Sequence, residues 1–344
     1  MKTPGESLRR IFSKIGRFFP LRRIYGFSVA FWTLLFPLHH LFACCGPFSG
    51  VKKHGAILEY LIEHYGEILK GFTGKNTAPE LFILPESTIW VCWWDGEEAM
   101  PALVKVCYKS ILRHAGSHPV RLVTKYNYGD FIPIPKYIVE KVNAGIITIT
   151  HFSDILRAAL LYKYGGIWMD ATVLVLADIT LENMAFYSLK APAKKSASIT
   201  LARFAGLSNT STASKIRHDG PQTSRWSGFL FAGTQNAVIF ELVRDILYAY
   251  WKDHNDQIEY LLFDYVIALG YDNVPAIREM IDHVPLCDAE KFELEKSLNN
   301  EYSEEGFSRF SLTPFHKLTW KKNFNIHTAN NKPTIYGYLL DQFN

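Results

Sequence analysis

Residues 151–176, HFSDILRAALLYKYGGIWMDATVLVL, decide the fold that we expect for this chain. The stretch predicts a helix, a tight turn and a strand. Ser153 is a favourable N-cap, because its hydroxyl can accept an unpaired backbone N–H of the first turn, and apolar residues then recur at three- and four-residue spacing. Gly165 and Gly166 end the helix, since glycine reaches the left-handed conformation at no steric cost. Residues 167–176 then predict one buried strand.

One charge, Asp170, interrupts this apolar strand. A lone buried carboxylate is costly unless it is paired or binds a cation. It is either a strand-end residue that caps a turn or pairs with a nearby Arg, or a functional acid, because open α/β sheets bind ligands at their strand ends. Asp154 and Arg157 lie three residues apart on one edge of the preceding helix. That edge can present a guanidinium to a phosphate and a carboxylate to hydroxyls.

Strands and helices alternate upstream of this stretch. We expect strands over 88–94, 120–125 and 146–150, and helices over 100–114 and 135–143. This alternation is typical of a mostly parallel sheet with helices on its faces. Downstream we expect a strand over 226–232, helices over 237–254 and 260–269, and a strand over 315–320. Residues 181–225, of which 193–217 are rich in Ser, Lys, Ala and Thr, predict a long segment over the mouth of an active site.

Composition narrows the class of protein. The 344 residues suffice for one large α/β domain with an appendage. A net charge of +4, without a basic helix interleaved with stacking aromatics, gives no reason to expect a nucleic-acid partner. The five cysteines are an odd number without paired metal spacing. We interpret them as reduced residues of a cytosolic domain, with Cys92 and Cys107 in the core.

The N-terminus is basic and then apolar. Residues 1–23 carry seven Lys and Arg against one Glu, and residues 24–45 are apolar and aromatic. Three interpretations remain open: a membrane-associated segment, spanning or interfacial; a signal peptide; and a buried helix. Membrane association is favoured, and Lys52 and Lys53 on the far side favour an interfacial or re-entrant anchor. Residues 55–72 predict an amphipathic helix, followed by a loop over 73–80.

The stretch SDILRAALLYKYGGIWMDATV, at 153–173, resembles the core motif of bacterial capsular polysaccharide synthesis proteins. These are similar to GT-A glycosyltransferases with the signature SD..R...L..yGG.ylD.D. The resemblance extends to STIWVCWWDGEEAMPALVKVCYKS, RLVTKYNYGDFIPIP, RWSGFLFAG, AYWKDHNDQIEYLLFDYVIALG and FHKLTWKK, and so covers about 81–324. It implies an α/β, GT-A-like and Rossmann-like fold, with a mostly parallel sheet flanked by helices and an N-terminal membrane-associated helical segment.

Four regions follow from this resemblance and from composition. Residues 1–50 form the membrane-associated segment, 51–85 an amphipathic helix and linker, 86–330 the GT-A-like glycosyltransferase domain and 331–344 a C-terminal tail. The resemblance implies a hexosyltransferase-type enzyme that moves a sugar from a nucleotide-sugar, with retention, to a growing capsular or other surface polysaccharide. The acceptor would be a glycan or lipid-linked saccharide at the cytoplasmic face of the bacterial inner membrane. The alternative is a non-catalytic, membrane-tethered scaffold that binds a nucleotide-sugar or a glycan.

The resemblance also implies roles for single residues. Asp170, Asp154 and Arg157 would be catalytic, with Asp170 as a ligand of Mn²⁺ or Mg²⁺, hard ions that prefer oxygen. The donor-binding residues would be Trp93, Trp94, Ser153, Tyr164, Gly165, Gly166, Thr172, Asp264, His316 and Lys317. For either tryptophan alone, packing in the sheet is the alternative.

The motif departs from the family pattern at Thr172, which stands where the second acid of D-x-D would be. Metal dependence is therefore open. Either Asp264, His316 or His327 completes a metal site, or the lysines of 315–322, which include Lys317, help to neutralise the diphosphate.

Overall fold

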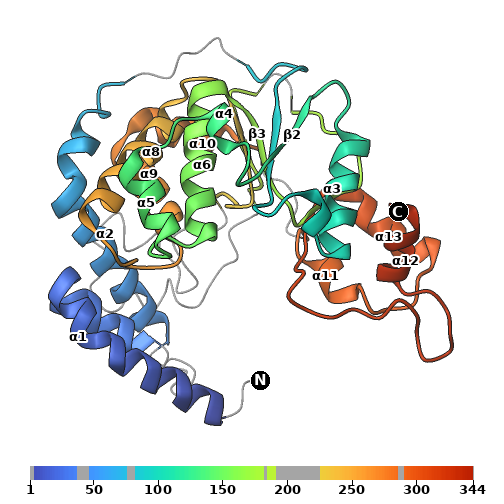
Figure 1. Ribbon diagram of the computed structural model, residues 1–344, viewed down its shortest axis with the longest axis horizontal. Coiled ribbons are helices and arrows are strands. Elements are labelled where there is room, and N and C mark those ends of the chain that lie inside the picture. The colour runs from blue at the N-terminus through green and yellow to red at the C-terminus, as the bar shows by residue number, and fades with distance from the viewer. Residues whose placement is uncertain are drawn as a thin grey trace. The chain divides into compact units, whose positions relative to one another are not determined.

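The computed structural model describes residues 4–36, 46–75, 82–181, 184–190, 225–285 and 290–343 (Figure 1). Most of the segment expected over an active-site mouth lies outside the described residues. The chain forms two compact units. The sheet unit comprises residues 77–192, 227–241 and 280–344, and the helical unit comprises residues 1–76, 193–226 and 242–279.

A five-stranded sheet organises the sheet unit. Its order is β2 (Val120–Val123), β1 (Ile89–Cys92), β3 (Gly166–Asp170), β6 (Leu230–Gly233) and β5 (Phe186–Ser188). β1 is parallel to both β2 and β3, whereas β6 is antiparallel to both of its neighbours. The prediction of a mostly parallel sheet flanked by helices is therefore confirmed.

Helices connect the parallel strands of the sheet unit. The short helix η2 (Glu97–Ala99) and α3 (Ala102–His114) connect β1 to β2, and α4 (Tyr128–Phe131), α5 (Lys136–Asn143) and α6 (Ile149–Tyr164) connect β2 to β3. α6 lies along the sheet beside β3 (Figure 1). Because β2 and β3 flank β1 on opposite sides, the connection from β2 to β3 passes β1.

The strand expected over 146–150 is wrong, and so is the N-cap at Ser153. α6 begins at Ile149, and Thr148 is its N-cap, with a side chain that accepts the backbone N–H of His151 at 3.4 Å. The Ser153 hydroxyl instead donates to the carbonyl of Thr150 at 2.6 Å, inside the helix. β-Branched residues raise strand propensity, but propensity is a weak signal that capping and packing override.

The single strand expected over 167–176 is also wrong, because it is two strands in different sheets. β3 ends at Asp170, and β4 (Val173–Val175) pairs antiparallel with β7 (Phe315–Lys317) in a two-stranded ribbon. The backbone N–H of Val175 is held by the Ser110 hydroxyl of α3 at 2.9 Å. The bond supplies a partner for a buried backbone N–H outside the main sheet, where an unpaired N–H would be costly.

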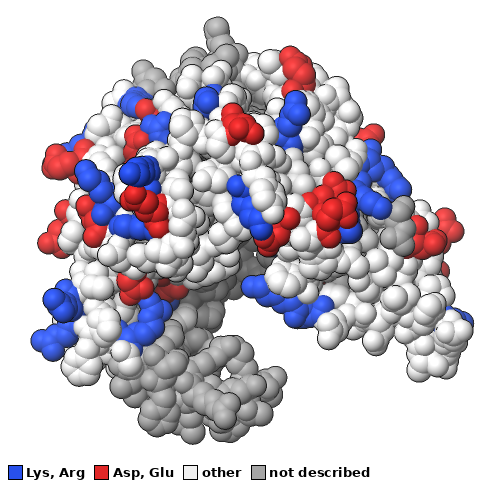
Figure 2. All heavy atoms as spheres, viewed as in Figure 1, with Lys and Arg blue, Asp and Glu red and all other residues white. Residues whose placement is uncertain are grey.

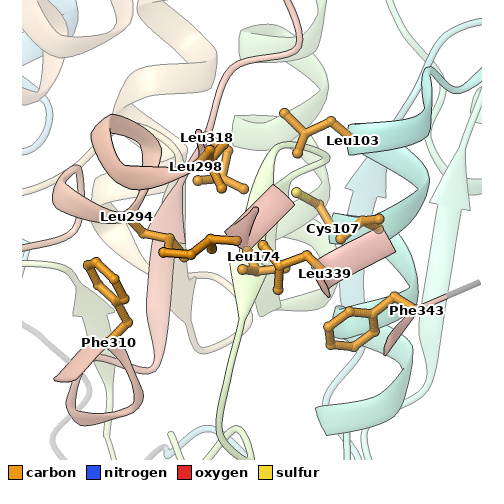
Figure 3. Close-up of a cluster of buried hydrophobic side chains, with 11 residues drawn as sticks. Leu103, Cys107, Leu174, Leu294, Leu298, Phe310, Leu318, Leu339 and Phe343 are labelled. Carbon is orange, nitrogen blue, oxygen red and sulfur yellow. The ribbon is translucent and has the colours of Figure 1, made fainter. Parts of the chain in front are cut away.

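A second core lies between the ribbon and the C-terminal helices. α3, α11 (Glu293–Ser297), α12 (Glu304–Ser308), η4 (Arg309–Leu312) and α13 (Ile335–Gln342) gather in one part of the sheet unit (Figure 1). Their side chains converge on Leu174 of β4, as Figure 3 shows. Cys107 of α3 is a free buried thiol within this cluster, in agreement with its expected place in the core.

The helical unit contains α1 (Pro4–Leu35), α2 (Gly46–Lys70), α9 (Leu262–Asn273) and most of α8 (Val238–Asp253) and α10 (Pro275–His283). Gly26 interrupts α1 with a non-helical backbone (φ 83°, ψ 170°). One face of α1 is buried through Leu21, Tyr25 and Val29, and the Tyr25 hydroxyl lies 2.7 Å from that of Tyr250. Among the described helices, none has the length and apolar character that crossing a membrane requires.

The turn from α6 to β3 generates the first prediction, because it requires two glycines. Gly166 has φ +95°, and a Cβ there would lie 2.3 Å from the Thr88 carbonyl oxygen. We expect Gly166→Ala to lower the free energy of unfolding by about 3 kcal/mol or more, from backbone strain and overpacking together. Urea unfolding followed by tryptophan fluorescence measures the change.

The matched control for this prediction is Gly116→Ala. Gly116 also has a left-handed backbone (φ +60°), but a Cβ there meets nothing within 4 Å. It should lose only about 1 kcal/mol, the cost of the conformation itself. Equal losses at the two glycines would contradict the steric explanation.

Candidate functional site

The candidate site lies where the order of the parallel strands in the sheet reverses, between β1 and β3. The connection that leaves β1 leads to β2 on one side, and the next connection returns from β2 past β1 to β3 on the other side, so the boundary between β1 and β3 is the switch point of the sheet. Open α/β sheets bind ligands outside the carboxyl ends of the strands at such a point. Cys92 and Asp170 are paired there in register, and Trp93 and Trp94 follow β1 directly.

Asp170 is held by two neighbouring side chains. Its Oδ2 accepts the Lys317 ammonium at 2.7 Å, and its Oδ1 accepts the Trp168 indole N–H at 3.1 Å. Lys317 also donates to the Thr172 hydroxyl at 2.6 Å. The side chains of Asp170 and Lys317 are 33% and 23% exposed, so solvent reaches the ion pair. The structure thus brings together three of the predicted residues.

The electrostatics of Asp170 favour its ionised form. Burial alone would raise the pKa of the carboxyl, but the positive charges of Lys317 and Arg157 and the hydrogen bonds from Lys317 and Trp168 outweigh burial and lower it. The neighbouring thiol of Cys92 behaves oppositely. Burial, together with the charge of Asp170, raises the pKa of Cys92 to about 12. Cys92 is therefore a neutral thiol and not a nucleophile.

Arg157 and Asp154 form an ion pair within α6. The side chains are 7% and 15% exposed. The guanidinium carbon of Arg157 lies 5.4 Å from the centre of the Trp168 ring and 6.0 Å from that of Phe231, both in the main sheet. The guanidinium of Arg157 therefore lies against the sheet, and its charge acts on Asp170.

The tryptophans expected to bind the donor contact other aromatic rings. Trp93 lies edge-on to Trp320 at 5.9 Å between ring centres. Trp94 is 5.6 Å from Tyr128 and 5.5 Å from Phe152. The indole of Trp94 is therefore one member of an aromatic group that also packs α6.

Several other predicted residues have structural partners. The Tyr164 hydroxyl donates to the Phe131 carbonyl at 2.7 Å, and Gly165 ends α6. His316 is fully buried, and its Nε2 lies 2.9 Å from the Phe310 carbonyl oxygen. Asp264 lies in the helical unit, where it accepts the indole N–H of Trp226 at 2.8 Å. The remaining candidate for a metal ligand, His327, forms an isolated bridge with Pro333.

The side chains around Asp170 fit a divalent cation poorly. Mg²⁺ is usually held by one or two carboxylates together with phosphates and water. Here the single carboxylate already carries the Lys317 ammonium, which would repel a second cation. Among the described residues, there is no group of three or more His, Cys, Asp or Glu side chains arranged to hold a metal.

The sequence did not predict that Phe229 and Lys291 lie beside Lys317. The ammonium lies 5.4 Å from the centre of the Phe229 ring, and that of Lys291 lies 5.9 Å from the same ring. The buried Lys291 also donates to the Ser227 hydroxyl. The spacing of neither Phe229 nor Lys291 in the sequence indicates this role. Ser227 and Phe229 do stand within RWSGFLFAG, one of the segments that carry the family resemblance.

Surface charge alone does not mark a site. On the face that Figure 2 draws, the Lys and Arg side chains of the described residues lie interspersed with Asp and Glu. The functional argument therefore depends on the contacts around Asp170.

The chain belongs to the capsular polysaccharide synthesis protein family, which it matches over residues 48–339. It is similar to the O-glycosyltransferase PaGT of Phomopsis amygdali, with 29% identity over 103 residues, or 27% of this chain. The match spans 25% of the length of that curated relative. Among solved structures it is similar to the PaToxG glycosyltransferase, with 14% identity and a TM-score of 0.36, over 70% of this chain and 92% of the other.

The Arg157–Asp154 pair generates the second prediction. Asp154→Ala removes a carboxylate from a buried guanidinium, and we expect the free energy of unfolding to fall by about 3 kcal/mol. Arg157→Met should cost a similar amount, and the double variant should cost clearly less than the sum of the two. Denaturant unfolding of the four proteins gives the coupling free energy. Additive losses would show that the ion pair stabilises nothing.

Proposed function

We propose that this protein is a glycosyltransferase that moves a sugar from a nucleotide-sugar to a growing capsular or other surface polysaccharide. The observation that carries the proposal is the ion pair of Asp170 and Lys317 at the switch point of the sheet. A charged, solvent-reachable pair at the carboxyl ends of parallel strands is suited to a charged ligand. Membership of the capsular polysaccharide synthesis family supports the sugar chemistry.

The reaction requires a leaving nucleoside diphosphate to be stabilised. As the bond from the anomeric carbon to the phosphate oxygen breaks, negative charge develops on that oxygen. A fixed positive group stabilises such charge most effectively when it is already oriented. Lys317 is oriented by Asp170 and Thr172. Trp93 and Trp94 follow Cys92 at the end of β1, and we assign them to the base or sugar of the donor.

We also propose retention of the anomeric configuration, with a lipid-linked saccharide as the acceptor. In a front-face reaction the leaving phosphate oxygen accepts the proton of the acceptor hydroxyl, so no separate general base is required. An inverting reaction would need an Asp, Glu or His within hydrogen-bond reach of that hydroxyl. The carboxylate of Asp170 is engaged by Lys317, which favours the reaction without such a base.

The proposal extends to attachment at the cytoplasmic face of the bacterial inner membrane. Phe19 and Phe27 of α1 are 69% and 57% exposed, and Ile24 is 39% exposed. Arg22 and Arg23, between them in the chain, are also exposed. Exposed aromatics among basic side chains suit an interfacial helix on anionic lipid.

The catalytic proposal yields the third prediction. Purified protein should slowly release one nucleoside diphosphate from a panel of UDP-, GDP- and dTDP-sugars. Asp170→Asn should lower that rate about 100-fold or more, because it frees the cation from its fixed position. Coupled detection of the released diphosphate measures the rate, and Asp178→Asn, an exposed carboxylate beside His114, is the matched control.

The outcomes of this assay separate the transferase from a scaffold. A scaffold binds a donor and never releases the diphosphate, even when oligosaccharide acceptors are added. Absence of both release and binding across the panel would contradict the proposal.

The membrane proposal yields the fourth prediction. The double variant Phe19→Ser/Phe27→Ser should bind vesicles of phosphatidylglycerol and phosphatidylethanolamine at least about tenfold more weakly, because it removes two exposed aromatic side chains that would enter the lipid. Sedimentation with vesicles measures binding, and added salt should weaken it through Arg22 and Arg23. Leu312→Ser, at a residue 84% exposed in the sheet unit, is the control. Unchanged binding by the double variant would refute this surface.

A further inference from the structure

The position of Lys317 is fixed by the backbone of the ribbon. β7 pairs with β4 so that Lys317 stands opposite Val173. The N–H of Leu318 donates to the Thr172 carbonyl at 2.9 Å, and the N–H of Lys317 donates to the Lys291 carbonyl at 2.8 Å. The lysine is therefore anchored on both sides of its own strand, beside the D-A-T sequence at the end of β3.

The ammonium occupies the place between the two side chains of that sequence. Residues two apart in an extended segment point to the same side, and Lys317 bonds both Asp170 Oδ2 (2.7 Å) and Thr172 Oγ1 (2.6 Å). In a D-x-D site, two carboxylates at these positions would hold a divalent cation. Here one acid has become a hydroxyl, which accepts a hydrogen bond but brings no negative charge.

The charges of the site follow the same pattern. One carboxylate balances one ammonium, whereas two carboxylates would balance a divalent ion. A cation added between Asp170 and Thr172 would meet the Lys317 ammonium at hydrogen-bond distance from both side chains, and like charges at such a distance repel strongly in a partly buried site. The Lys317 ammonium therefore already occupies the position that a metal ion would take between Asp170 and Thr172.

From this geometry we infer that Lys317 takes the place of the metal ion: its ammonium binds the diphosphate of the donor, and Asp170 and Thr172 position it. The inference rests on the proposed function and names the group that contacts the leaving phosphate. An ammonium has three N–H donors, and within the described part of the chain two of them are used by Asp170 and Thr172. The third is available to a phosphate oxygen.

Two neighbouring residues, Phe229 and Lys291, also favour the binding of an anion at Lys317. The Phe229 ring lies 5.4 Å from the Lys317 ammonium, where an aromatic face stabilises a cation that has lost part of its water. Lys291, at 5.9 Å from the same ring, adds a second positive charge. Asp170 is consequently a positioning residue, and Lys317 is the catalytic residue that touches the substrate.

The experiment measures binding rather than turnover. Isothermal titration of the full chain with UDP, GDP, dTDP and inorganic pyrophosphate, in EDTA and then in Mn²⁺, should show diphosphate affinity that does not depend on the metal. Lys317→Met should weaken that affinity about 10- to 100-fold, the value of a charge-assisted hydrogen bond. Lys317→Arg should retain part of it. Lys296→Met, at a lysine that is 65% exposed and paired with Glu293, should bind as the parent protein does.

A metal readout independent of the nucleotide completes the design. Electron paramagnetic resonance of free Mn²⁺ should show no binding to the parent protein, and binding to Lys317→Ala/Thr172→Asp, which creates the paired carboxylates. Circular dichroism of each variant confirms folding. Diphosphate binding that requires Mn²⁺, or that survives Lys317→Met, would overturn the inference and leave the proposed function standing. Absence of binding by every diphosphate with and without Mn²⁺ would overturn both.

Discussion

The close approach of three backbone segments at Gly165 and Gly166 is the constraint on which the sheet unit depends. A Cβ at Gly165 would lie 2.6 Å from the backbone nitrogen of Gln235, and one at Gly166 would lie 2.3 Å from the carbonyl oxygen of Thr88. The two glycines therefore let β3 enter the sheet between the start of β1 and the end of β6. A side chain at either position would push the central strand away from one of its neighbours.

The position of β3 then determines how the site is assembled. With β3 in register against β1, Asp170 falls opposite Cys92 at the carboxyl edge. The chain leaves the sheet directly afterwards, because β4 pairs with β7 and packs on α3. That second pairing delivers Lys317, which is 147 residues away in sequence, to the side chain of Asp170. Two separate strand pairings thus place a carboxylate and its counter-ion together.

The sequence predicted the parts of this arrangement that local patterns encode. Alternation of apolar segments predicted the mostly parallel sheet, the glycine pair predicted the end of α6, and the interrupting charge marked Asp170. The start of α6 was predicted wrongly, because the residues before it are β-branched and suggested a strand. Thr148, rather than Ser153, caps the helix. The partner of Asp170 was beyond any local pattern. Lys317 stood among several lysines in 315–322, and only the register of β4 with β7 distinguishes it from them.

The ion pair also determines how the site responds to pH. The pKa of Asp170 lies below its ordinary value of 3.8, because Lys317 and Arg157 together outweigh burial. A carboxyl with a lowered pKa in the folded state stabilises the fold fully above its unfolded pKa, and this contribution is lost only as the pH falls through the lowered value. Asp170 is therefore ionised, and its hold on Lys317 is constant, across the whole neutral range. A change in diphosphate binding between about pH 6 and 8 is then expected from the ligand, whose terminal phosphate titrates near pH 6, and not from the carboxylate that positions the lysine.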